Sequence, residues 1–366
     1  MNWRDRRVLL TGHTGFKGSW LALWLQQKGA EVCGLALAPP TVTNLFQEAA
    51  IAQGMNSVIG DIRDTELVKR TFVEHRPEIV FHLAAQSLVR ASYEDPIGTY
   101  STNVMGTASI LDAARSADSV RAIIVITTDK CYENQEWEWP YRETDRLGGY
   151  DPYSNSKACA ELVISAYRNS FFNPANYDRH GVAIASVRAG NVIGGGDWAE
   201  DRLVPDIMRA FLAQRPVRIR NPRATRPWQH VLEPLRGYLR VAESLYEAGT
   251  TNAEAWNFGP EHSDAQPVEW IVRELAETWG EGAQWEIDGA EHPHEARNLK
   301  LDWSKAQARL GWTPALHLKD ALAMTASWYK LQSKQHNMRE FTEEQIKSYE
   351  QLFNHASSSQ TGGVQA

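Results

Sequence analysis

The sequence predicts an α/β fold in which a doubly wound parallel sheet is followed by a smaller C-terminal lobe. Three observations predict this architecture. Short apolar runs alternate with amphipathic stretches in the first half of the chain, a glycine-rich turn follows the first run, and the alternation stops after Gly190. Parallel strands that helices cover on both faces form such unbroken apolar runs. Repeated strand–helix units then imply right-handed crossovers.

Five apolar runs and one shorter return strand are the expected strands. The first expected helix carries Phe16, Trp20 and Trp24 at intervals of four residues and ends at Gly29, where a C-cap glycine belongs. The five runs are residues 7–10, 32–37, 79–83, 122–127 and 182–187, and the return strand is 256–258, ended by Gly259 and Pro260.

The second half of the chain is organised differently. Residues 194–205 and 215–227 are rich in Gly, Pro, Arg and Trp, which predicts irregular, ligand-facing structure. Residues 341–353 fit an amphipathic helix, and 357–366 predict a disordered tail. The expected domains are residues 1–190 with a return segment at about 231–258, a smaller lobe of 191–230 and 259–330, and a C-terminal helix and tail of 331–366.

The composition is that of an ordinary globular protein. Its 366 residues, 43% of them hydrophobic, are enough for a large core. The net charge of −7 argues against nucleic acid as the main partner, although local arginines can still bind an anionic ligand. No apolar stretch has the length of a membrane span or a secretion signal. Because Cys33, Cys131 and Cys159 are too few and too irregular for disulfides or zinc, we expect a cytoplasmic, reduced, metal-free protein.

A glycine-rich turn lies between the first strand and the first helix, in the segment RVLLTGHTGFKGSWLALWL. Gly12 permits the tight turn, Gly15 lets the backbone approach a pyrophosphate, and Gly18 allows close packing of the helix on the strand. The helix N-terminus adds free N–H groups and partial positive charge. An ordinary strand–helix turn is the alternative, but the flanking strand and helix favour a Rossmann domain that binds a dinucleotide. The other candidate contacts in the turn are Thr14, Phe16 and Lys17.

The residue that chooses between NAD and NADP is missing. An acidic residue near the end of the second strand usually binds the ribose hydroxyls of NAD. Here residues 37–40 read Leu-Ala-Pro-Pro, with no arginine to mark NADP either. Asp61, followed by Ile62, is a candidate contact to the adenine. A turn residue that only ends a strand is an equally good interpretation of Asp61.

Tyr153 and Lys157 form the candidate reactive pair. Four residues apart, they share one face of a helix, with Cβ atoms roughly 6 Å apart. A free phenol has a pKa of about 10, and a neighbouring ammonium and a nicotinamide cation both favour the phenolate. Tyr153 can then accept the proton of a substrate hydroxyl while hydride leaves the same carbon. The alternative is an exposed Tyr and Lys at a helix N-terminus, since this spacing is common.

Polar side chains follow the apolar run 122–126. They are Thr127, Thr128, Asp129 and Lys130. Ligands of parallel sheets bind at the carboxyl ends of the strands. A hydroxyl, a carboxylate and an amine that arrive there together predict chemistry, although a polar loop after a buried strand explains any one of them.

The motifs as a set resemble the extended short-chain dehydrogenase/reductases that act on sugar nucleotides. They are TGHTGFKG at 11–18, HLAAQ at 82–86, TTDKCYE at 127–133 and YSNSK at 153–157. Within that family the chain is most similar to the 4,6-dehydratases of the CDP-glucose type. The features of that type are FKGSWL, Ala-Pro-Pro after the second strand, RAGNVIGGGDW at 188–198, and TTDK where the dTDP-glucose type has an Asp-Glu pair. The resemblance spans residues 7 to about 314.

This resemblance implies a bound NAD and a CDP-glucose substrate, with Leu83, Ala84 and Ala85 among the cofactor contacts. It also implies an internal redox cycle: oxidation at C4 by NAD, loss of water across C5 and C6, and return of the hydride to C6. In that cycle Tyr153 takes the proton of the 4-hydroxyl, and Lys157 lowers the pKa of Tyr153 and binds the nicotinamide ribose. The product would feed 3,6-dideoxyhexose synthesis for bacterial surface polysaccharide.

The strand-end residues receive their roles from the same resemblance. Thr128 would hydrogen-bond the 4-oxygen, and Asp129, kept protonated, would help the C6 hydroxyl leave. Lys130 stands where the dTDP-glucose enzymes have a glutamate. It is either the base that takes the C5 proton or an electrostatic stabiliser of the enolate.

The resemblance implies a substrate side as well. Guanidinium groups suit the oxygens of a diphosphate, and Arg226 and Arg297 are better candidates than Arg202. A solvated surface charge is the alternative for each arginine. Asn103 could instead brace the active-site helix through backbone hydrogen bonds. The full set of implied substrate contacts is Gln86, Ser87, Asn103, Asn191, Arg202, Arg226 and Arg297.

Three rival functions stay open. A sugar-nucleotide 4-epimerase would share the glycine turn, Tyr153 and Lys157, but it has no need for Asp129 and Lys130 at the strand end. A dehydratase of another nucleotide sugar is the second rival. A non-catalytic dinucleotide-binding regulator is the third, and it has no need for Thr128, Tyr153 and Lys157 together. The helices expected near 104–116 and 154–167 imply, by resemblance, a homodimer or a dimer of dimers.

Overall fold

The protein centres on one seven-stranded sheet, in a computed structural model that describes residues 1–280, 282–288 and 299–359. The strand order is β11-β6-β5-β4-β1-β2-β3, and every pairing within the sheet is parallel. The strands are β1 Arg7–Thr11, β2 Glu31–Ala36, β3 Asn56–Ile59, β4 Ile79–His82, β5 Ala122–Ile126, β6 Ala183–Ala189 and β11 Ala255–Phe258. The strand order reverses at β1 and β4, so the predicted doubly wound fold is confirmed.

Six of the seven strands match the apolar runs within one or two residues, including the return strand β11, which pairs with β6. The sequence analysis missed β3. Its four residues, Asn-Ser-Val-Ile, lie at the edge of the sheet and none of them is fully buried. A short, half-exposed edge strand lacks the continuous apolar run by which the buried strands were recognised.

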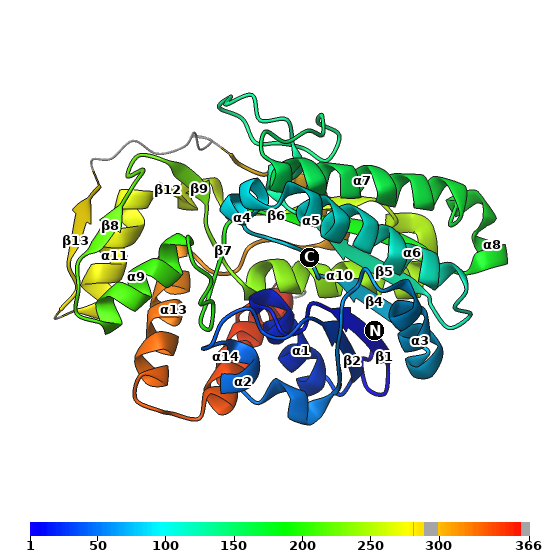
Figure 1. The fold of residues 1–366 in the computed structure, drawn as a ribbon, viewed down its shortest axis with the longest axis horizontal. Coiled ribbons are helices and arrows are strands. Elements are labelled where there is room, and N and C mark those ends of the chain that lie inside the picture. Colours follow the sequence, from blue (N-terminus) through cyan, green and yellow to red (C-terminus); the bar gives the residue numbers. More distant parts are fainter. Residues whose placement is uncertain (281, 289–298, 360–366) are drawn as a thin grey trace, which may run out of the picture.

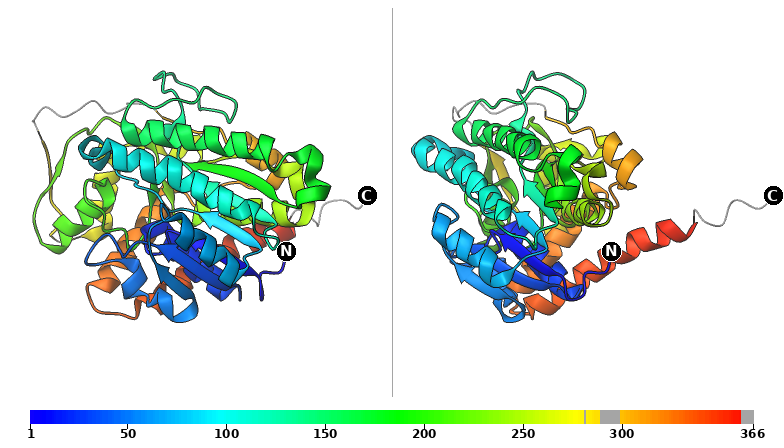
Figure 2. Two further views of the ribbon diagram at one scale, coloured as in Figure 1. Left: turned by 45° about the vertical axis from the view of Figure 1, so that its right-hand side comes forward. Right: turned by 90° about the vertical axis from the view of Figure 1, so that its right-hand side faces the viewer.

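Helices cover both faces of the sheet (Figures 1 and 2). Val8 and Leu10 of β1 point into a core shared with α1 and α10, whereas Leu9 points into a core shared with α3, α6 and α7. The helices are α1 Phe16–Gln27, α2 Leu45–Glu48, α3 Thr65–His75, α4 Val89–Glu94, α5 Pro96–Tyr100, α6 Gly106–Arg115, α7 Pro152–Ser170, α8 Tyr177–His180, α9 Leu203–Leu212, α10 Leu232–Ala248, α11 Val268–Trp279, α12 Ser304–Leu310, α13 Leu318–Gln332 and α14 Met338–Ser359.

The second lobe is built from short strand pairs and helices, which Figure 1 shows beside the sheet domain around α9, α11 and α13. The pairs are β7 Val192–Ile193 with β10 Gln229–His230, β8 Val217–Ile219 with β13 Trp285–Ile287, and β9 Thr225–Pro227 with β12 Ala265–Pro267. Segments before and after α10 thus return to the same lobe.

The C-terminal helix α14 packs on the first helix of the sheet domain. The Trp24 ring meets the Tyr349 ring edge-on, and the Trp24 indole N–H donates to Glu350 over 2.8 Å. Because α14 runs to Ser359, residues 357–359 are helical and not part of a tail, which corrects the expectation; residues 360–366 lie outside the described part. Within the described residues, every helix is too short or too polar to span a bilayer.

Candidate active site

The glycine-rich turn leaves no room for side chains at two of its three glycines. Gly12 has a φ of +79°, and a Cβ there would lie 2.7 Å from the Ala84 nitrogen. A Cβ on Gly18 would lie 2.0 Å from the Gly12 carbonyl oxygen. Gly15 differs, because an added Cβ would approach the chain no closer than 3.4 Å, so the protein's own packing does not demand glycine there. Gly15 is also the N-cap of α1 and offers no capping side chain, which leaves the helix N-terminus open to a phosphate.

The two candidate contacts beyond this turn lie in different surroundings. Asp61 accepts hydrogen bonds from the backbone N–H and the guanidinium of Arg63, and these bonds hold the pKa of its carboxyl below the usual value. Ile62 is buried, and its side chain lies where a Cβ on Gly106 would be. Asp61 thus has an arginine partner in the turn after β3, and its contact with the adenine stays a prediction.

Tyr153 and Lys157 both point into the interior from the first turns of α7. The helix starts here because Pro152 occupies its first position and Asp151 caps the Ser154 N–H. The Lys157 ammonium donates to the Ile126 carbonyl at the end of β5 over 3.1 Å. Burial lowers the pKa of Lys157 to about 8.

The pKa of Tyr153 differs from the expectation. Burial raises it to about 12, with the Thr128 hydroxyl opposing the shift. Desolvation of the phenolate thus outweighs the neighbouring positive charges in the protein alone. The chain by itself therefore does not lower the pKa of Tyr153, as Lys157 was expected to do. At neutral pH Tyr153 keeps its proton unless further positive charge is nearby.

Thr128, Asp129 and Lys130 lie where β5 ends and the short helical turn η3 (Asp129–Cys131) begins. The Thr128 hydroxyl donates to Asp129 Oδ1 over 3.0 Å and accepts the Lys130 backbone N–H. Asp129 is 2% exposed, and within the described residues its Oδ2 has no hydrogen-bond partner. Burial raises the pKa of Asp129, although the charges of Lys130 and Arg226 oppose the rise. These are the surroundings of a carboxyl that retains its proton.

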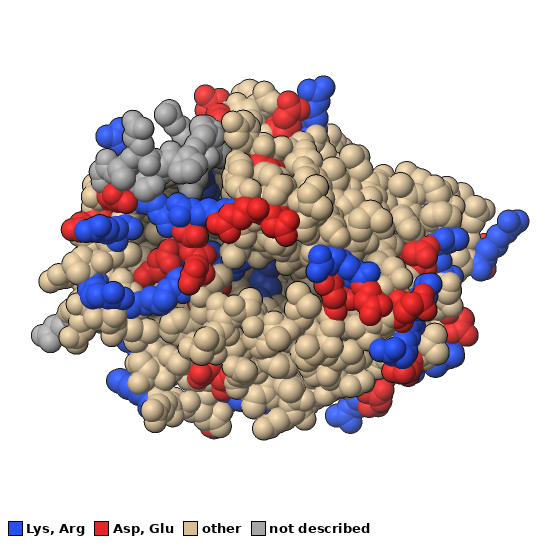
Figure 3. All heavy atoms as spheres, in the orientation of Figure 1, with Lys and Arg blue, Asp and Glu red and all other residues tan. Residues whose placement is uncertain are grey.

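Charged groups from several segments converge on this strand end. Burial, Lys157 and Arg202 lower the pKa of Lys17 to about 8, whereas Asp129 and Asp197 oppose the shift. The glycine turn, the end of β5, α7 and the second lobe therefore share one electrostatic environment. Figure 3 shows a hollow on this face of the molecule, with basic atoms at its floor and charged side chains along its rim.

Arg202 and Ser87, both predicted on the substrate side, come together. The Arg202 guanidinium donates to Ser87 Oγ over 3.0 Å and to Asp197 over 2.8 Å. Arg226 lies in β9 with 9% exposure, close enough to Asp129 to influence its pKa. Asn191 is half-buried just after β6, and its carbonyl accepts the Gln229 N–H. Arg297 lies outside the described residues.

Asn103 and Gln86 use their side chains inside the protein. Asn103 is 1% exposed, accepts the Gln86 backbone N–H and donates to the Gln86 carbonyl and to Ser156 Oγ on α7. These are the contacts that the bracing alternative predicts, and a contact of Asn103 with the substrate stays a prediction. The Gln86 amide bonds to Leu88 and Thr99.

Two charged residues of this region were missed. Asp197 belongs to a segment that was predicted only to be irregular, yet it pairs with Arg202. Glu161 lies one helical turn beyond Lys157 on α7, and that spacing could have revealed it. Within the described residues, no group of three His, Cys, Asp or Glu side chains forms a metal site.

Known proteins match nearly the whole chain. A family model described as GDP-mannose 4,6 dehydratase matches residues 9–325. The CDP-glucose 4,6-dehydratase of Salmonella typhimurium is 56% identical over 347 residues, which cover 95% of this chain and 97% of the relative. The dTDP-glucose 4,6-dehydratase of Xanthomonas campestris is 26% identical over 88% of this chain and 92% of the relative. The UDP-glucose 4-epimerase of Thermus thermophilus, solved in complex with NAD, matches with a TM-score of 0.75 and 27% identity, over 88% of this chain and 99% of the epimerase.

Proposed function

Because this chain belongs to the GDP-mannose 4,6-dehydratase family, whose members include enzymes of nucleotide sugars, we propose that it is a CDP-glucose 4,6-dehydratase that works with a tightly held NAD. Its reaction is the conversion of CDP-glucose to CDP-4-keto-6-deoxyglucose and water, which makes it a hydro-lyase. The 56% identity to a CDP-glucose 4,6-dehydratase over almost the full length of both chains supports the choice of nucleotide.

The buried carboxyl of Asp129 is the observation that favours a dehydratase function over an epimerase function. Epimerisation at C4 requires no acid for the C6 hydroxyl. Elimination of that hydroxyl as water requires a proton donor, and a carboxyl whose pKa burial raises is suited to hold and deliver that proton. Asp129 lies beside Thr128, whose hydroxyl also influences the pKa of Tyr153, so the acid and the phenol face a common space.

The chain fits the cofactor. The open backbone at Gly15 and the uncapped N-terminus of α1 suit a pyrophosphate, and the Lys157 ammonium lies at the adjacent strand end. Bound NAD would supply a reversible acceptor for hydride. The residues that would hold it are Gly12, Thr14, Gly15, Phe16, Lys17, Gly18, Asp61, Ile62, Leu83, Ala84, Ala85, Tyr153 and Lys157.

The side chains around this space divide the proton transfers among them. Tyr153, which the positive charge of a bound nicotinamide would favour as the phenolate, accepts the proton of the sugar 4-hydroxyl, and Thr128 hydrogen-bonds the same oxygen. Once C4 is a ketone, the C5 hydrogen is acidic, and Lys130 either takes it or stabilises the enolate. Asp129 gives its proton to the C6 hydroxyl, which leaves as water together with the C5 proton. The 4-keto-5,6-alkene that remains becomes the 4-keto-6-deoxy product when the hydride removed from C4 is returned to C6 and a proton is returned to C5.

The substrate side is part of the same proposal. Arg202 and Arg226 reach the cleft from the second lobe, and their guanidinium groups suit the diphosphate. Ser87, whose hydroxyl accepts a hydrogen bond from Arg202, would contact the hexose, and Asn191 would contact the diphosphate or a neighbouring sugar oxygen. Arg297 completes the implied set. Ser87 and Arg202 come from the sheet domain and the second lobe, so a substrate between them would contact both.

We also propose that two copies associate through α5, α7 and the π-helical segment η2 (Ser101–Met105). Ile97 is 78% exposed, Met105 62% and Leu162 59%, and these three elements pack on one another. Large apolar side chains gathered on one exposed face are typical of a subunit interface. Light scattering should show a dimer or a dimer of dimers, and a monomer would overturn this part.

The decisive experiment is a product assay. The purified protein is incubated with NAD and CDP-glucose, with dTDP-, UDP- and GDP-sugars in parallel, while product mass and NADH absorbance are followed. Loss of one water from CDP-glucose without net NADH is the expected result. A product of unchanged mass would identify a 4-epimerase, net NADH would identify an ordinary dehydrogenase, and a different preferred sugar nucleotide would correct the substrate.

A further inference from the structure

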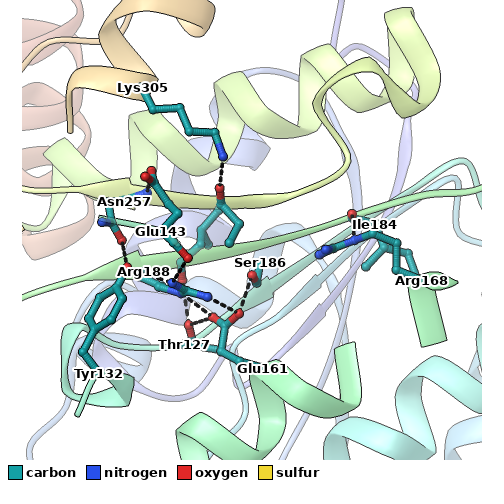
Figure 4. Close-up of polar contacts among 12 residues, drawn as sticks. Thr127, Tyr132, Glu143, Glu161, Arg168, Ile184, Ser186, Arg188, Asn257 and Lys305 are labelled. Atoms are coloured by element: carbon teal, nitrogen blue, oxygen red, sulfur yellow. Dashed lines mark hydrogen bonds and ion pairs between the residues drawn. The ribbon is translucent and has the colours of Figure 1, made fainter. Parts of the chain in front are cut away.

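A buried ion pair lies directly behind the candidate active site. Glu161 of α7 and Arg188 of β6 face each other with a distance of 2.8 Å between Oε2 and Nη2, and both side chains are 3% exposed (Figure 4). The Arg188 Nε also donates to Glu161 Oε1 over 2.9 Å, so the contact is bidentate. No part of the mechanism above uses either residue.

The Glu161 carboxylate receives two further hydrogen bonds. Thr127 Oγ1 donates to Oε1 over 2.5 Å, and Ser186 Oγ donates to Oε2 over 2.7 Å. Burial alone would raise the pKa of Glu161, but Arg188 and these hydrogen bonds outweigh it, so the pKa lies below its usual value. The carboxylate therefore stays ionised, and it is held by Thr127 at the end of β5, by Ser186 of β6 and by the Arg188 guanidinium.

These donors connect the two halves of the candidate active site. Glu161 lies one helical turn after Lys157, and Thr127 directly precedes Thr128. The Lys157 ammonium donates to the carbonyl of Ile126, on the other side of Thr127. Two bonds from one face of α7 thus hold the end of β5 at the point where it delivers Thr128.

Arg188 extends the connection beyond η3. Its Nη1 donates to the Tyr132 hydroxyl over 2.7 Å, and that hydroxyl donates to Asn257 of β11 over 2.8 Å. Tyr132 directly follows the turn that carries Asp129 and Lys130. Both ends of the segment 127–132 are therefore fixed to the same ion pair, as Figure 4 shows.

We propose that Glu161 is a positioning residue: through Thr127 and through Arg188 it sets where Thr128 and Asp129 lie relative to Tyr153 and Lys157. The inference rests on the proposed dehydratase function. A misplacement of about 1 Å in reacting groups can cost roughly a hundredfold in rate. A carboxylate that only stabilised the fold would have no such effect on the rate.

Removal of Glu161 itself is a poor test, because it would leave the Arg188 guanidinium buried without its partner. Thr127 and Ser186 offer a matched pair, since each donates one hydrogen bond to the same carboxylate. Only Thr127 adjoins the segment that carries the reacting groups; Ser186 lies in the middle of β6. Thr127→Val keeps the shape and loses the bond, Thr127→Ser keeps the hydroxyl, and Ser186→Ala is the control.

The experiment measures kcat, KM and thermal melting of the three holoenzyme variants on CDP-glucose. We expect Thr127→Val to lower kcat about tenfold or more, with KM changed by no more than about twofold. Thr127→Ser should keep the kcat of the parent. Ser186→Ala should lower the melting temperature by as much as Thr127→Val does and leave kcat unchanged. Equal kcat losses in Thr127→Val and Ser186→Ala, or no loss in either, would overturn the positioning role. An unmodified enzyme that releases no water would instead overturn the proposed function. If Thr127→Val is insoluble, Thr127→Ala takes its place, and its kcat should be lower than that of Ser186→Ala by the same factor.

Discussion

Replacement of Asp129 by Asn is expected to stabilise the protein and to remove its dehydratase activity. Asp129 is 2% exposed, and its Oδ2 has no hydrogen-bond partner within the described residues. Burial raises the pKa of Asp129, so the native state binds this proton more tightly than the unfolded chain does. The free energy of unfolding therefore falls as pH rises from the unfolded pKa of about 3.9 through the native pKa, and the loss is complete above it.

The size of the effect follows from the unpaired oxygen. A buried acceptor without a partner costs about 1–3 kcal/mol, and more when it is charged. Asn is neutral at every pH and so has no ionised form to penalise in the buried site, but it keeps a polar atom in the same place. We therefore expect a gain of about 1 kcal/mol at pH 7, which corresponds to a rise in melting temperature of roughly 2 °C for a chain of this size.

The assay compares thermal melts of both proteins, without added ligand, between pH 4 and 8. The stability difference should be present at pH 7 and should shrink toward pH 4, while Asp118→Asn, at an exposed carboxylate, should change nothing. Water loss from CDP-glucose should fall about 10²–10⁴-fold, with exchange of the C5 hydrogen into deuterated solvent retained. An Asn variant less stable than the parent at pH 7 would refute the burial argument, and retained water loss would refute the acid role.

Three other substitutions test the remaining roles. Tyr153→Phe keeps the buried ring and should lower turnover at least 10³-fold, with NAD binding, followed by fluorescence, within a few-fold of the parent. Burial lowers the pKa of Lys157 to about 8, so the native state holds this proton less tightly than the unfolded chain; the stability of the ligand-free protein should rise with pH between about 8 and 10.4, and Lys157→Met should remove that part of the rise in thermal melts. Arg202→Met should raise KM for CDP-glucose about tenfold, as loss of a charge-assisted hydrogen bond does, whereas Arg70→Met on the exposed face of α3 should not; equal KM values would remove Arg202 from the substrate site.

The elements that the sequence predicted best are those whose neighbours are local. The glycine turn and the five apolar strands follow from spacing and composition, because a strand, a turn and a helix specify them within some twenty residues. The strand β3 was not predicted, because a strand at the edge of a sheet needs no continuous apolar run. The assignment of Asp129 at a strand end was possible because parallel strands end on the same side of a sheet.

Long-range contacts decided the rest of the site. The contacts of Asn103 with Gln86 and Ser156 were not predictable, because neither neighbour is close to it in sequence. The upward shift of the Tyr153 pKa depends on how deeply the folded chain buries the phenol, and no sequence spacing predicts that burial. Glu161 lies on α7, and its partner Arg188 lies 27 residues away on β6, so the role of Glu161 became visible only in the folded chain.

The position of β11 has a consequence for how the chain can fold during synthesis. Ala255–Phe258 forms the outer strand beside β6, and α10, which precedes it, covers β5 and β6. A ribosome that has released only the first 190 residues has therefore exposed a chain whose β6 has an open edge and an uncovered face. Unpaired apolar edges are sites of aggregation, and translation proceeds at about 5–20 residues per second. The edge and the face of β6 therefore stay exposed for several seconds, until the first segment of the second lobe and α10 have been synthesised. A fragment that ends at residue 190 should aggregate instead of behaving as an independent domain.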